Sequence, residues 1–147
     1  MKAAEILNDL IKANNKCIAH YKQTVSDTIG VHNELISILE SRINENSQHK
    51  QELVQKVRQL GKDVNDKPTD SEPGIWMDIR TSFISNDRKT IFSTCEHYEN
   101  SILHTYEKAL QAKEEMTEDV HQLIANQKEK LAVAYEMIKK HKENAAM

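Results

Sequence analysis

The scarcity of helix-breaking residues constrains this sequence more than any other feature. Its 147 residues include only three glycines and two prolines, and both prolines and one of the glycines fall within the single stretch 62–74. A chain with so few breakers forms long helices rather than many short strands. Apolar residues make up 38 % of the chain, which is enough at this length for one domain with its own core. We therefore expect one all-α domain over residues 1–147.

Apolar residues recur with a period near 3.6 in four stretches, which is the pattern of amphipathic helices. The expected helices cover residues 3–28, 32–60, 87–113 and 117–143. Gly61 follows the second helix as a C-terminal cap, and Thr117 begins the fourth as an N-terminal cap. A shorter apolar segment at 75–85 is expected to form an extra helix that packs onto the bundle through Trp76.

The lengths of the connections predict the topology. The link around Gly30 is short, so the first two helices should be antiparallel neighbours. At about 3.3 Å per extended residue, the connection 61–86 is long enough to span a whole helix, which rises about 1.5 Å per residue. The third helix should therefore run parallel to the second. The predicted fold is a ferritin-like four-helix bundle with one long crossover connection that contains the short extra helix.

Several classes of function find no support in the sequence. The net charge of −3 provides no basic field for nucleic acid or anionic lipid. No apolar run approaches the roughly 18 residues of a membrane span, and the N-terminus lacks the apolar core of a signal peptide. Cys17 and Cys95 are isolated, which suits reduced, buried and slowly reacting thiols in a cytoplasmic protein. We expect a cytoplasmic protein that binds neither nucleic acid nor membrane.

The middle of the third helix has an unexpected charge. Glu99 stands within the apolar stripe, where a carboxylate must be paired, hydrogen-bonded or bound to a metal. Each of the other three helices also places polar residues at inward positions near its middle. We expect these residues to form one polar layer across the core: Asn14, Cys17, Asn46, His49, Glu99 and Gln127.

Ferritin-like proteins hold two irons at this level, using a Glu from each of two helices and a Glu-x-x-His from each of the others. Here the first helix has no carboxylate between Asp9 and Asp27, and the fourth places Gln127, Leu131 and Tyr135 inward. We therefore expect no metal and no cofactor. If iron or manganese did bind, its ligands would come from Glu45, His49, Glu52, Glu96 and Glu99.

The alternative to a metal is a set of protein partners for the two glutamates Glu96 and Glu99, with the polar layer fixing helix register. The expected partners are His49, Tyr21, Tyr135 or a lysine. On this interpretation Glu99→Gln costs little stability, because the amide retains an acceptor.

Several motifs in order resemble a known family. They are ILNDLI near the start, LG at the end of the second helix, WMDIR after the loop, CEHYE in the third helix and TYEKAL after it. Over nearly its whole length the chain resembles a bacterial family of uncharacterised ferritin-like four-helix-bundle proteins. The resemblance implies a cytoplasmic bacterial protein with no established activity, and a stress-related role is inferred for relatives. The family's Cys-Glu-x-x-Glu corresponds to Cys95, Glu96 and Glu99, whereas Tyr135 stands where many members have a histidine.

Together these features favour a structural or interaction protein, in a stress-related role and without catalysis. The alternative is a non-haem, di-iron-type bundle with oxidase or iron-handling activity. A third interpretation is a homodimer that uses the segment around Trp76 as its contact. The sequence leaves the partner and the ligand open.

Overall fold

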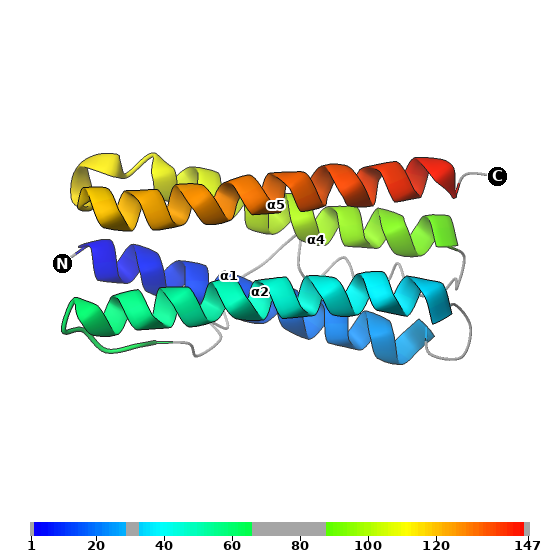
Figure 1. Ribbon diagram of the computed structural model, residues 1–147, viewed down its shortest axis with the longest axis horizontal. Coiled ribbons are helices and arrows are strands. Elements are labelled where there is room, and N and C mark those ends of the chain that lie inside the picture. The colour runs from blue at the N-terminus through cyan, green and yellow to red at the C-terminus, as the bar shows by residue number, and fades with distance from the viewer. Residues whose placement is uncertain (1, 29–32, 66–87, 146–147) are drawn as a thin grey trace.

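The computed structural model describes residues 2–28, 33–65 and 88–145, and four long helices dominate them (Figure 1). These are α1 (Lys2–Thr28), α2 (Asn33–Gln59), α4 (Arg88–Leu110) and α5 (Glu118–Asn144), with a short 3-10 helix, η2 (Lys113–Glu115), before α5. No strand occurs in the described part of the chain. The predicted all-α four-helix bundle is confirmed.

The four helices form two antiparallel pairs, α1 with α2 and α4 with α5, and α1 also packs against α4 (Figure 1). Helix α4 runs in the same direction as α2, because Arg88 at the start of α4 lies 3.9 Å from Glu34 at the start of α2. The predicted parallel arrangement of the second and third helices is therefore confirmed, and the chain between them joins opposite ends of the bundle. The expected helix at 75–85, with Trp76, lies outside the described residues, as does Gly30.

Helix α2 ends where the sequence indicates. Gly61 has a φ of +72°, a conformation that glycine adopts without steric cost. Its N–H donates to the Arg58 carbonyl at 2.9 Å, and the Lys62 N–H donates to the Val57 carbonyl at 3.2 Å. This pair of bonds is a Schellman motif, which satisfies carbonyls at the end of the helix.

Two other helix ends differ in detail from the prediction. Helix α4 ends at Leu110 rather than at residue 113, because the chain turns and forms η2 there. Thr117 occupies the N-cap position of α5, but its hydroxyl accepts no hydrogen bond from the backbone N–H groups of the first turn. Instead the hydroxyl donates to the Asp119 carboxylate. That hydroxyl and the Lys56 ammonium lower the pKa of Asp119 to about 2.

The core is apolar toward both ends of the bundle and polar in the middle. Its buried apolar side chains include Leu7, Leu10, Leu35, Leu39, Leu53, Val57, Ile91, Phe92, Val120, Ile124, Leu131 and Ile138. Burial of each large aliphatic side chain contributes about 1.5–3 kcal/mol, which holds the four helices around the polar middle. None of the described helices is long and apolar enough to cross a membrane.

Candidate functional site: a buried ion pair at the bundle centre

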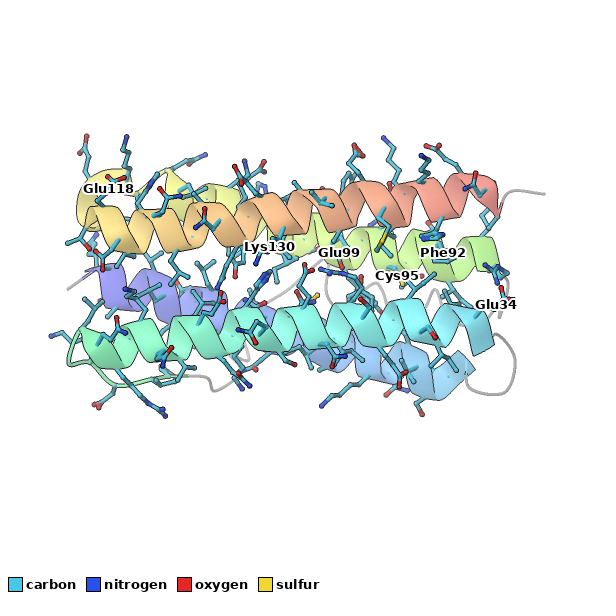
Figure 2. All side chains as sticks on the ribbon, in the orientation of Figure 1. Glu34, Phe92, Cys95, Glu99, Glu118 and Lys130 are labelled. Atoms are coloured by element: carbon cyan, nitrogen blue, oxygen red, sulfur yellow. The ribbon has the colours of Figure 1, made fainter. Side chains whose placement is uncertain are left out.

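Glu99 is fully buried, and its carboxylate joins three helices. Arg42 of α2 donates from Nε to Oε2 at 2.9 Å and from a terminal nitrogen to Oε1 at 3.1 Å. The Tyr21 hydroxyl of α1 also donates to Oε2. In Figure 2 the Glu99 side chain lies between α4, which bears it, and α2. Bidentate pairing of this kind is the strongest and most directional contact between a guanidinium and a carboxylate.

Arg42 is only 2 % exposed, yet it keeps its charge. Burial acts to lower its pKa, but the adjacent Glu99 carboxylate and its hydrogen bonds outweigh burial, so the pKa is raised above its usual value. The third guanidinium nitrogen lies 2.8 Å from Oε1 of Glu45, whose side chain is 34 % exposed. The guanidinium thus links a carboxylate at the centre of the core to another at its edge.

Arg42 is the functional residue that the sequence analysis missed. The buried residues of α2 follow a heptad-like order, Leu35, Leu39, Arg42, Asn46, His49 and Leu53. Alternating steps of four and three residues are the signature of an inward seam, and this spacing could have identified position 42 as buried.

The expected partners of the two glutamates are partly right. Tyr21 does bond Glu99, and Lys142 donates to Glu96 at 2.7 Å. No hydrogen bond within the described chain joins Glu99 to His49 or Tyr135, and the bonds to its carboxylate come from Arg42 and Tyr21. The bidentate partner of Glu99 is the Arg42 guanidinium, which is not among the expected partners His49, Tyr21, Tyr135 or a lysine.

A second network of hydrogen bonds, separate from the Arg42–Glu99 ion pair, connects all four helices. Asn14 Nδ2 donates to the Tyr106 hydroxyl at 2.9 Å, and that hydroxyl donates to Gln127 Oε1 at 2.6 Å. Gln127 Nε2 then donates to the His49 carbonyl at 3.1 Å and to Glu52 Oε1 at 2.9 Å. Burial raises the pKa of Tyr106, so its phenol stays protonated and can donate.

All six residues expected in the polar layer are buried, but they do not form one contact network. Asn14, His49 and Gln127 belong to the second network, Asn46 donates to Cys17 Sγ at 3.2 Å, and Glu99 belongs to the ion pair. Within the described residues no hydrogen bond connects Glu99 to the other five. The six side chains lie in the middle of the bundle but divide among three separate sets of hydrogen bonds.

The side chains present do not fit a di-iron centre. Among the described residues no group of three or more His, Cys, Asp or Glu side chains is placed to hold a metal ion. The acids considered as ligands are engaged by other groups: Glu99 and Glu45 by Arg42, Glu52 by Gln127, and Glu96 by Lys142. A guanidinium cannot lose its proton in a protein, so the centre already contains a permanent cation.

With this geometry established, comparison with known proteins gives the family. Residues 2–112 match the family described as a domain of unknown function, DUF2383. The chain belongs to this family. A search of curated proteins finds no match to this chain.

Among solved structures, the DUF2383 bundle is similar to a protein described as a ferritin like, diiron-carboxylate protein from Bacillus anthracis str. Ames. The two share 16 % sequence identity with a TM-score of 0.69, over 98 % of this chain and 95 % of the other. At that level of identity the likeness shows the fold, and the predicted ferritin-like bundle is confirmed.

The variant Glu99→Gln tests the ion pair. The expectation that this change costs little stability did not include a buried cation as the partner of Glu99, and Arg42 is such a partner. Removing the charge leaves the Arg42 guanidinium buried and uncompensated, so we expect a loss of about 3–5 kcal/mol in the free energy of unfolding. The double variant Arg42→Met/Glu99→Gln should recover much of that loss, because neither charge remains. Urea unfolding of the variants measures both effects.

The matched control is Glu96→Gln, one turn earlier on the same helix. Its pair with Lys142 is partly exposed, at 18 % and 32 % for the two side chains, so we expect a loss of roughly 1 kcal/mol or less. Equal losses for Glu99→Gln and Glu96→Gln would contradict the dominance of the buried pair.

The two thiols are expected to react slowly. Cys17 and Cys95 are both buried and free. Burial, and then the Glu99 carboxylate, raise the pKa of each thiol, so little nucleophilic thiolate exists near neutral pH. Labelling by a disulfide reagent should be much slower in the native protein than in urea. Native labelling as fast as in urea would contradict the buried placement.

His49 should make stability depend on pH. Burial lowers its pKa from the ordinary value of 6.5; Glu45 and Glu52 act to raise it, and Arg42 and Lys130 act to lower it further. Below pH 6.5 the unfolded chain binds a proton that the folded chain resists. The free energy of unfolding should therefore fall as pH drops from 7 to 5.

The pH effect is measured by urea unfolding at both pH values in wild type and in His49→Gln. The variant should lose less stability than wild type on acidification. His97→Gln, which changes an exposed histidine on α4, is the control and should behave as wild type. Identical pH dependence in wild type and His49→Gln would contradict the prediction.

Proposed function

We propose that this DUF2383 bundle is a structural or interaction protein without metal-based catalysis. The observation that supports the proposal is the Arg42–Glu99 ion pair, in which a buried guanidinium binds both oxygens of the fully buried carboxylate. In this arrangement Arg42 provides the positive charge that a metal would otherwise supply to Glu99.

A metal ion could use Glu99 only by displacing Arg42. Separating a buried ion pair leaves an uncompensated charge, which costs about 3–5 kcal/mol. The displaced guanidinium would also repel a divalent cation in surroundings where charges are poorly screened. The facing groups on α1 and α5 are Asn14, Cys17, Tyr21 and Gln127, and these neutral groups provide none of the carboxylates that a di-iron site takes from its helices.

The proposal extends to a cytoplasmic location and to a stress-related role, which rest on the sequence and on the family resemblance. It also includes a protein partner, for which a second copy of the chain is the first candidate to test. Oxidase or iron-handling activity at a di-iron centre is the alternative.

Metal analysis distinguishes the two functions. We expect protein purified from cells grown with added iron and manganese to contain far less than one metal ion per chain. The reason is that Arg42 already neutralises Glu99. Elemental analysis of wild type, Glu99→Gln and the control Glu96→Gln makes the measurement.

Two outcomes would overturn the structural proposal in favour of a metal centre. One is stoichiometric iron or manganese in wild type and Glu96→Gln that is lost in Glu99→Gln. The other is bound metal in wild type that restores the stability of the protein after chelation and re-addition.

A further inference from the structure

Three neighbouring residues in the polar middle have buried atoms without a protein partner. These atoms are Asn14 Oδ1, Asn46 Oδ1 and both ring nitrogens of His49. The three side chains are at most 1 % exposed. An unsatisfied buried polar group costs about 1–3 kcal/mol, so several in one place indicate a ligand that satisfies them together.

Helix packing brings the three residues to one spot. The bond from Asn46 Nδ2 to Cys17 Sγ sets residue 46 of α2 opposite residue 17 of α1. Asn14 precedes Cys17 by one turn on the same face, and His49 follows Asn46 by one turn. Because α1 and α2 are antiparallel (Figure 1), Asn14 lies at the level of His49. The three buried residues therefore lie within about one helical turn of one another on the packed faces of α1 and α2.

Existing bonds determine which atoms are available. Asn14 Nδ2 donates both to the Leu10 carbonyl and to the Tyr106 hydroxyl, each at 2.9 Å, so its free atom is the acceptor oxygen. Asn46 Nδ2 donates to Cys17 Sγ, so the free atom of Asn46 is likewise its acceptor oxygen. Burial lowers the pKa of His49, and a neutral imidazole has one N–H donor. The three side chains therefore offer one donor and three acceptors, of which two are the asparagine oxygens and one is the second ring nitrogen of His49.

We propose that Asn14, Asn46 and His49 form a binding site for one internal water molecule. The water donates one hydrogen to each asparagine oxygen and accepts the imidazole N–H. Buried waters in proteins typically make about three hydrogen bonds to groups that would otherwise be unsatisfied. The second ring nitrogen of His49 is an acceptor and takes no part.

A neutral ligand fits this site better than an ion. An anion would face two amide oxygens, which repel it. A cation would find only uncharged ligands among Asn14, Asn46 and His49. The carboxylates near His49 are already engaged by other groups, Glu45 by Arg42 and Glu52 by Gln127.

The water would also complete a closed circuit of hydrogen bonds. Asn14 is already joined through Tyr106 and Gln127 to the His49 carbonyl, which connects α1, α4, α5 and α2 in turn. A water between Asn14 and the His49 ring joins the first helix of that chain to the last. The water itself therefore ties α1 to α2, whereas the existing bonds through Tyr106 and Gln127 join this pair to α4 and α5. This role does not depend on whether the protein has a partner or binds metal elsewhere.

A crystal structure that resolves ordered solvent tests the site directly. We expect one water within hydrogen-bond distance of Asn14 Oδ1, Asn46 Oδ1 and a ring nitrogen of His49. In solution, the side-chain amide protons of Asn14 and Asn46 should show NMR cross-relaxation to a long-lived water. A His49 ring bonded to Glu45 or Glu52 with no water present would overturn the proposal, as would a metal ion in the site.

Two substitutions at one position separate hydrogen bonding from packing. His49→Gln keeps a donor and should retain the long-lived water signal, whereas His49→Leu should lose it. Asn100→Leu replaces an exposed asparagine on α4 and should leave the signal unchanged. Retention of the signal in His49→Leu would overturn the assignment of the imidazole as the donor, and the wild-type measurement remains decisive if that variant does not fold.

Discussion

A carboxylate without any solvent exposure sits at the centre of this bundle, and its charge must be balanced locally. Glu99 is balanced by the Arg42 guanidinium and by the Tyr21 hydroxyl. Transfer of either charge from water is costly by itself, so the two residues are energetically inseparable. Three of the four helices must keep their relative register for these bonds to form, which makes the pair a strict condition on how α1, α2 and α4 pack.

Ferritin-like bundles show that the middle of four long helices can accommodate buried carboxylates when cations bind there. This DUF2383 chain has the same architecture but supplies the cation from its own α2. A guanidinium differs from a metal because it is covalently attached, permanently charged and directional in its bonding. It can hold a carboxylate in place, but it offers no open coordination position for a substrate, which agrees with the structural role proposed above.

The second polar network also holds the helices in register, but it does so through hydrogen bonds between neutral groups. Asn14, Tyr106 and Gln127 connect helices that the apolar core alone would hold with less definite register. Apolar contacts are non-directional, whereas each buried hydrogen bond is lost if a helix slides by one turn. The apolar ends of the bundle thus provide most of the stability, and the polar middle defines one arrangement among several of similar apolar burial.

The sequence by itself determined the elements and their directions. Breaker positions and the 3.6-residue period indicated four helices, Gly61 marked the end of α2, and the long connection implied that α4 runs parallel to α2. The same period placed Glu99, Asn14 and Gln127 inward, because which face a residue occupies depends only on its spacing along one helix.

Only the tertiary structure decided the partners. Arg42 has a long side chain that can extend to solvent or cover apolar surface, so its charge suggested an exposed position although its heptad spacing indicated an inward one. Which of several donors reaches Glu99 depends on the relative height and rotation of three helices. Those quantities arise from packing between residues far apart in the chain, such as 42 and 99, and no local pattern encodes them.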